Sequence, residues 1–146
     1  MPNWAPMDEE RFYIWLAGFV DGDGMITINR GTKDDHIELM LGNTNEEVIR
    51  YIHERLKVGS VSARLSIKAI HKQSFYYKTT GFDAAPIIEN IMPYLRIKHK
   101  QARVALDFQS TKTHTRCLVP LEIQLRRDQL VKEIRELNAK GNILTE

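Results

Sequence analysis

Two acidic residues at the end of a long uncharged segment have the spacing that best suits metal chemistry. Asp21 and Asp23 follow residues 12–20, which carry no charge, and they alternate with Gly22 and Gly24. The apolar residues of this segment recur at helical spacing, so both acids fall at a helix C-terminus. The macrodipole already makes that end negative, and carboxylates there are stabilised by a cation. The segment therefore predicts a divalent-metal site of the kind that activates water for hydrolysis.

The same predicted helix carries a stripe that favours contact with another helix. Ile14, Gly18 and Gly22 are spaced four residues apart and would line one side. Each glycine costs about 1 kcal/mol relative to alanine in a helix interior. That cost is tolerated where a second backbone must come close. We therefore expect Ile14, Gly18 and Gly22 to form a close helix–helix contact.

The elements around this helix follow from the hydrophobic periodicity of the rest of the chain. Further helices are predicted over residues 43–59, 84–92, 98–108 and 120–139, and strands over residues 25–30, 36–43, 60–68 and 73–80. Three consecutive aromatic residues, Phe75-Tyr76-Tyr77, leave the phase of the last strand undecided. The order predicts an α+β fold of the type α-β-β-α-β-β-α, in which helices cover one face of an antiparallel four-stranded sheet.

The opposite face of this sheet would be lined by polar side chains. Such a face can be merely solvated, but β-ribbons can also enter a DNA groove and contact base edges. We interpret the face as a saddle over double-stranded DNA. The residues expected to contact DNA, most of them outward residues of the strands, are Thr27, Asn29, His36, Glu38, Met40, Ser62, Arg64, Ser66, Lys68, Gln73, Tyr77 and Lys100.

Composition is that of an ordinary globular protein, with 42% hydrophobic and 27% charged residues among 146. We expect a single domain over residues 1–146. No apolar run approaches the ~20 residues of a membrane span, so no membrane partner is expected. The lone Cys117 excludes a disulfide framework and a cysteine-based zinc site. It favours an intracellular location, in the cytoplasm or nucleoid or in an organelle.

The distribution of charge says more than the net charge of +2. Residues 1–24 carry a net charge of −4, whereas residues 25–80 and residues 81–146 carry +3 each. Acid is thus concentrated around the predicted metal site, and the basic excess lies elsewhere. Metal-dependent cleavage of a nucleic acid needs both features.

Residues 16–24, L-A-G-F-V-D-G-D-G, closely resemble the motif that names the LAGLIDADG homing endonucleases. Six of the nine letters are identical, Phe19 and Gly22 depart from the motif, and Val20 replaces isoleucine conservatively. Residues 93–102, P-Y-L-R-I-K-H-K-Q-A, resemble the family's P-[FY]-L-x-x-K-x-x-Q segment. The resemblance implies the family's α+β fold. Because one motif is present, it also implies a homodimer paired through the motif helices.

The resemblance further implies divalent-metal-dependent hydrolysis of both DNA strands at a long, near-palindromic site, leaving short 3′ overhangs, with Mg²⁺ or Mn²⁺ as cofactor. Asp23 matches the family's metal ligand, one from each subunit, and the carbonyl of Gly22 would assist. Lys98 matches the catalytic lysine, near the attacking water or the scissile phosphate. Asn45 stands where relatives often carry a glutamine that orders active-site water. A second basic residue is usual nearby, but Ile49 falls at that position with Arg50 next to it, so this group is not assigned.

Asp21 also matches the motif, and we expect it to shape the helix end rather than bind metal. Two other functions on the same fold stay open, an RNA-binding intron maturase and a catalytically inactive DNA-binding protein. The intact Asp23 and Lys98 favour cleavage. A phosphotransferase that acts on small molecules is disfavoured, because no phosphate-cradling loop follows a parallel strand.

Overall fold

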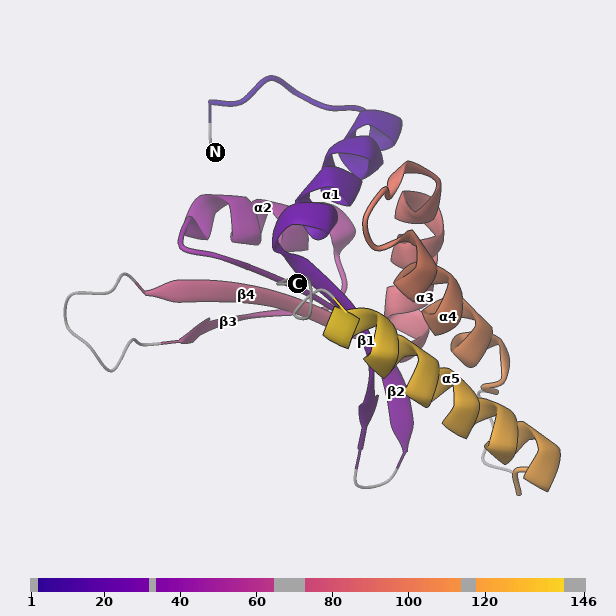
Figure 1. Ribbon diagram of the computed structural model, residues 1–146. Coiled ribbons are helices and arrows are strands. Elements are labelled where there is room, and N and C mark those ends of the chain that lie inside the picture. The colour runs from indigo at the N-terminus through magenta and orange to yellow at the C-terminus, as the bar shows by residue number, and fades with distance from the viewer. Residues whose placement is uncertain (1–2, 32–33, 65–72, 114–117, 141–146) are drawn as a thin grey trace.

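A computed structural model describes residues 3–31, 34–64, 73–113 and 118–140, and its elements follow the predicted order (Figure 1). The helices are α1 (Glu9–Asp23), α2 (Glu46–Leu56), α3 (Gly81–Ile91), α4 (His99–Ser110) and α5 (Leu121–Lys140), with a 3₁₀ turn, η1 (Met92–Tyr94). The strands are β1 (Gly24–Arg30), β2 (Asp35–Asn43), β3 (Ser60–Arg64) and β4 (Ser74–Thr80). The strand expected over residues 60–68 is described only as far as Arg64. Ser66 and Lys68 therefore lie outside the described residues.

The four strands form one antiparallel sheet in the order β1-β2-β4-β3. Its core face is apolar, since the register pairs Ile26 with Leu39 and Leu41 with Tyr77, and all four residues are fully buried. Helices α1 to α4 contact the sheet. Figure 1 shows α2 along the upper side of β3 and β4, while the lower side of these strands is uncovered. Helix α1 contacts β1 and β2. The predicted α+β fold is confirmed.

Tyr77 corrects one expectation, because it points into the core rather than toward DNA. It is 0% exposed and pairs with Val61 of β3. Its hydroxyl donates to the backbone oxygen of Val58 at 2.7 Å, and burial raises the pKa of the phenol to about 12. The phase of β4 is thereby settled. Tyr76 and Lys78, on either side of Tyr77 in the strand, belong to the open face.

Local sequence determines where the first two helices begin and how α1 ends. Asp8 caps α1 by accepting a hydrogen bond from the backbone N–H of Arg11 at 2.8 Å. Asn45 caps α2 by accepting one from the backbone N–H of Val48 at 3.1 Å. Both caps satisfy N–H groups that have no partner within their helix. Gly24 follows α1 directly, and a Cβ there would lie 2.8 Å from the α1 backbone. Glycine therefore permits the abrupt passage from α1 into β1.

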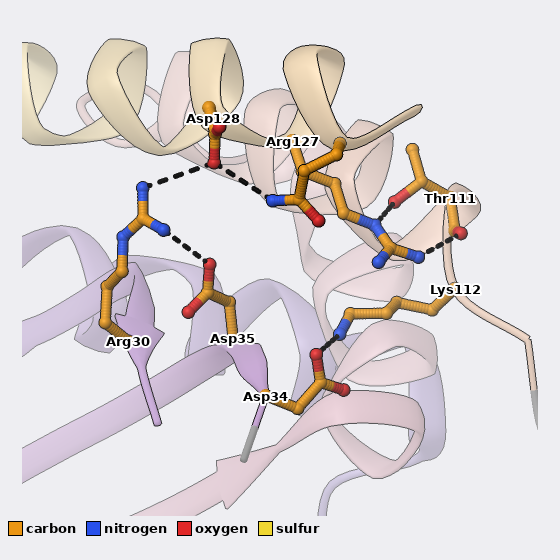
Figure 2. Close-up of polar contacts among 8 residues, drawn as sticks. Arg30, Asp34, Asp35, Thr111, Lys112, Arg127 and Asp128 are labelled. Atoms are coloured by element: carbon orange, nitrogen blue, oxygen red, sulfur yellow. Dashed lines mark hydrogen bonds and ion pairs between the residues drawn. The ribbon is translucent and has the colours of Figure 1, made fainter. Parts of the chain in front are cut away.

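The far end of the β1–β2 hairpin is tied to α4 and α5, as Figure 2 shows. Arg30 pairs with Asp35 of β2 at 3.1 Å and with Asp128 of α5 at 3.4 Å. Lys112, which follows α4, pairs with Asp34. Surface ion pairs of this kind contribute about 0–1 kcal/mol each. Their main effect is therefore to orient the hairpin.

Helix α5 covers the outer edge of β1. The side-chain amide of Asn138 donates to the backbone oxygen of Ile26 at 3.1 Å, and Leu130, Val131 and Ile134 are buried. Because β1 is an edge strand, this cover protects backbone groups that could otherwise pair with another strand. Although α5 is 20 residues long, no helix of the described part of the chain is long and apolar enough to cross a membrane.

Candidate metal-dependent active site

Asp23 is the last residue of α1, and its side chain is exposed. One carboxylate oxygen, Oδ2, accepts a hydrogen bond from the amide nitrogen of Asn43 at 3.3 Å. Asn43 is the last residue of β2, and its own amide oxygen accepts from the backbone N–H of Asn45 at 2.8 Å. The amide oxygen of Asn43 is therefore fixed by the backbone of Asn45, while its amide nitrogen orients the carboxylate of Asp23. Among the described residues, this leaves the other oxygen of the carboxylate available to a ligand.

Asp21 ties the segment before α4 to the end of α1. Its carboxylate accepts hydrogen bonds from the backbone N–H groups of Arg96 at 2.8 Å, Ile97 at 3.1 Å and Lys98 at 3.0 Å. The ammonium group of Lys98 donates to the backbone oxygen of Asp21 at 2.9 Å. Both carboxylate oxygens of Asp21 are thus engaged by the chain itself. The sequence led us to expect that Asp21 shapes the helix end rather than binds metal. Its contacts also hold Lys98 at the end of α1, on a residue two positions before Asp23.

The structure gives Asn43, rather than Asn45, the place beside Asp23. The side-chain oxygen of Asn45 serves as the N-cap of α2, so the water-ordering role expected for Asn45 stays a prediction. Ile49 is fully buried, and Arg50 pairs with Glu46 of its own helix at 2.7 Å. Ile49, an apolar residue, therefore does not supply the second basic group of the expected site, and that group stays unassigned. Sequence reasoning missed Asn43, although its position at the end of a strand, two residues before a helix cap, was a usable signal.

The Ile14, Gly18 and Gly22 stripe faces outward. Ile14 is 45% exposed, and both glycines are exposed. A Cβ added to either glycine would meet no heavy atom within 4 Å in the described part of the chain, apart from its own helix. By contrast, Leu16 and Val20 of the same helix are fully buried. Helix α1 therefore has one face in the core and one apolar, small-residue face without a partner among the described residues.

The open face of the sheet carries most of the residues expected to contact DNA. The register places them in cross-strand pairs, such as Asn29 with His36 and Ser62 with Tyr76. Expected residues that are exposed or partly exposed in the structure are Thr27, Asn29, His36, Met40, Ser62, Arg64, Gln73 and Lys100. Lys100 lies in the first turn of α4, and Gln73 directly precedes β4.

Two features of this face differ from expectation. Glu38 lies opposite Thr27 on the open side but is only 5% exposed, so the contact with DNA expected for Glu38 is not available in this arrangement. Tyr76 and Lys78 were not singled out from the sequence, yet both lie on this face. Alternation could have found them if the phase of the three aromatic residues had been known.

One chain offers only part of a metal site at the end of α1. Within the described ranges, no group of three His, Cys, Asp or Glu residues could hold an ion. The oxygen donors available are the Asp23 carboxylate and the Gly22 carbonyl, which suit hard cations such as Mg²⁺ or Mn²⁺. The donor atoms are therefore of the type that binds a divalent ion, but one chain supplies too few of them.

Comparisons with known proteins show which family the chain resembles. The sequence profile described as LAGLIDADG endonuclease matches residues 16–113. The DNA endonuclease I-CvuI of Chlorella vulgaris is 26% identical over 104 residues, covering 65% of this chain and 62% of that protein. The match thus spans less than two thirds of the relative's length.

Solved structures share the fold. The crystal structure of I-CvuI in complex with its target in the presence of 2 mM Ca has a TM-score of 0.69 at 22% identity, covering 88% of this chain and 82% of that one. The archaeal intron-encoded homing endonuclease I-Vdi141I complexed with DNA has a TM-score of 0.71 at 14% identity, covering 89% and 86%. The family profile extends over both the acid-bearing helix end and Lys98. The chain belongs to the LAGLIDADG endonuclease family.

Proposed function

We propose that this protein is a site-specific homing endonuclease that binds double-stranded DNA as a homodimer and hydrolyses both strands with a divalent metal ion. The observation that carries the proposal is the end of α1, where Asp23 is exposed and Lys98 is fixed beside it by Asp21. The DNA complexes of I-CvuI and I-Vdi141I support the choice of substrate.

A second copy of the chain would complete the metal site. Gly22 belongs to the stripe, and Asp23 follows it directly, so pairing two α1 helices along the stripe would bring two carboxylates together. Two neighbouring carboxylates repel each other unless a cation lies between them. The incomplete donor set of one chain is the expected state of a site shared by two.

The free-energy cost of Gly18 and Gly22 in a helix supports the same dimer. No contact within the described chain requires a missing side chain at Gly18 or Gly22, yet each costs about 1 kcal/mol relative to alanine. A close approach by a second helix backbone would explain why both positions are glycine. The same approach would bury the exposed Ile14 of the stripe. The proposed dimer interface is therefore formed by Ile14, Gly18 and Gly22.

Each residue of the site then has a defined task. A bound divalent ion would supply an activated water and offset the charge that develops on the phosphodiester. Asp23 would bind the ion, with the Gly22 carbonyl, and Asn43 would orient the carboxylate through its hydrogen bond. Lys98, anchored on the carbonyl of Asp21, would hold its positive charge near the scissile phosphate. Mg²⁺ is the proposed ion and Mn²⁺ its substitute, since both accept oxygen donors.

The open face of the sheet would supply specificity. Two such faces related by a two-fold axis would contact two half-sites, so the target should be near-palindromic. Side chains on β1 to β4 would contact base edges in the major groove, while Lys100 would contact phosphate. The phosphate contacts would add affinity without adding specificity.

The experiment that tests this function uses a randomised double-stranded DNA library. The purified protein is incubated with the library and Mg²⁺, Mn²⁺ or EDTA, and the cut ends are sequenced. We expect cuts at one near-palindromic sequence with short 3′ overhangs, present with either metal and absent with EDTA. Specific binding without cutting under every condition would indicate an inactive DNA-binding protein. If the protein binds RNA but not DNA in a parallel binding assay, it would be a maturase. Either result would refute the proposal.

A further inference from the structure

The aromatic ring of Tyr76 lies across the neighbouring strand on the open face of the sheet. The register pairs Tyr76 of β4 with Gly42 of β2. A Cβ added to Gly42 would lie 2.7 Å from Cε1 and 3.0 Å from Cδ1 of that ring. Contacts this short do not occur, so any other residue at position 42 would displace the ring. The absence of a side chain at Gly42 is therefore what allows the ring its present position.

Arg64 of β3 is placed against the same ring. It pairs with Ser74 of β4 and is thus the diagonal neighbour of Tyr76 on the open face. Its guanidinium carbon lies 5.1 Å from the Tyr76 ring centroid, within the ~6 Å range of a cation–π contact. The Arg64 side chain is exposed, and it forms no salt bridge to any described residue. Its N–H groups are therefore not committed to a carboxylate in that part of the chain.

From these contacts we infer that Gly42, Tyr76 and Arg64 form a base-reading unit, in which Tyr76 is a positioning residue that holds the guanidinium of Arg64 for guanine. This rests on the proposed function and names further residues that determine its specificity. A guanidinium reads guanine by donating two hydrogen bonds, to O6 and N7, and this requires one defined orientation of the group. A free arginine must lose side-chain freedom to adopt that orientation, whereas one already held against a ring loses less.

Substitutions of Tyr76 separate the ring from the hydroxyl group. Tyr76→Leu removes the aromatic face, whereas Tyr76→Phe keeps the face and serves as the matched control. Gly42→Ala displaces the ring without changing either Tyr76 or Arg64. The size of the effect follows from the ordering of one long side chain, which is about 2- to 10-fold in affinity.

The primary measurement is the base preference of binding, from a set of targets that carries each of the four bases at every position. Arg64→Ala should reduce the preference for guanine at two symmetry-related positions. Tyr76→Leu and Gly42→Ala should reduce it at the same two positions, by about 2- to 10-fold, and Tyr76→Phe should not. Tyr76→Leu should add nothing in the Arg64→Ala background, because the residue it positions is already gone.

A second measurement needs no DNA. In the free protein the side-chain protons of Arg64 should show an upfield ring-current shift by NMR, retained in Tyr76→Phe and lost in Tyr76→Leu. The inference is overturned if Tyr76→Leu changes the preference at other positions, lowers binding to all targets equally, or changes nothing. It is also overturned if Arg64→Ala leaves base preference intact while the wild type still cuts a specific site. Loss of the proposed function would look different, because the wild type itself would then show no specific binding or cleavage.

Discussion

Replacing Gly18 with alanine should stabilise the isolated chain and weaken its dimer, two effects of opposite sign from one methyl group. Among the described residues, the added Cβ meets no heavy atom within 4 Å outside its own helix. The substitution should therefore yield the ordinary helix preference for alanine over glycine, about 1 kcal/mol of added stability. A glycine with a purely internal role would not show this gain.

At the proposed interface the same methyl group appears twice, once from each copy, between two closely approaching backbones. Overfilling a close contact costs about 1–3 kcal/mol. Since each 1.4 kcal/mol is a factor of ten, the dissociation constant of the dimer should rise roughly 5- to 150-fold. Sedimentation equilibrium measures this constant directly. Urea unfolding at several protein concentrations separates chain stability from dimer stability, because only the latter depends on concentration.

Two further variants serve as controls for the Gly18 experiment. Ile14→Ala removes an exposed apolar side chain from the stripe, so it should weaken the dimer with little effect on the isolated chain. Glu54→Ala alters an exposed residue of α2 away from the stripe and should not change dimerisation. If Gly18→Ala leaves the dissociation constant unchanged, the stripe is not the interface. A wild-type protein that stays a 17.0 kDa species at micromolar concentration, with and without DNA, would refute the homodimer itself.

Three other substitutions test individual parts of the account. Tyr77→Phe should cost about 0.5–1.5 kcal/mol at neutral pH through the lost hydroxyl hydrogen bond. The pKa of Tyr77 in the folded protein, about 12, exceeds its ordinary value of 10.0. The contribution of Tyr77 to the free energy of unfolding should therefore be fully present below pH 10 and fall between pH 10 and 12. That fall, up to about 3 kcal/mol, should be absent in urea titrations of Tyr77→Phe; an identical pH profile would mean that Tyr77 is not buried. Asn43→Ala should raise the Mg²⁺ concentration for half-maximal cleavage about tenfold by freeing the Asp23 carboxylate, and an unchanged metal titration would remove Asn43 from the site. Asp21→Ala should lower the free energy of unfolding by about 2–3 kcal/mol, because three backbone N–H groups lose a charged acceptor, and it should also slow cleavage by releasing Lys98; wild-type values of both would contradict its role as an anchor.

The fold could be predicted largely from local patterns, and the reason is visible in particular elements. Helix α1 carries an uncharged segment with helical spacing that is followed by two acids and two glycines, so its C-terminal end was readable. Strands β1 and β2 alternate cleanly between apolar and polar residues. In β4 the pattern fails, because Phe75, Tyr76 and Tyr77 are all aromatic, and only pairing with β2 and β3 decides which of them is buried.

The candidate site was harder to predict, because its contacts join residues distant in the chain. The two segments that resemble the family identified Asp23 and Lys98, but nothing local indicates that Asn43 reaches Asp23, which lies 20 positions earlier in the chain. Asn45 had the more suggestive sequence position, yet its side chain is used by the helix that it caps. Glu38 has the correct alternation for the open face, but its burial depends on neighbours that periodicity does not specify.

The most direct test of the central claim compares the wild type with Asp23→Asn on the target found in the library, measuring binding and cleavage in parallel. Asparagine keeps the shape of the side chain and can retain a hydrogen bond to Asn43, but it removes the charge that a divalent ion needs. We predict that the wild type cuts both strands with Mg²⁺ and not with EDTA. Asp23→Asn should bind the same sequence with affinity within about tenfold of the wild type and cut neither strand. Cleavage by Asp23→Asn at the wild-type rate would contradict the account, because the metal site would then not depend on Asp23.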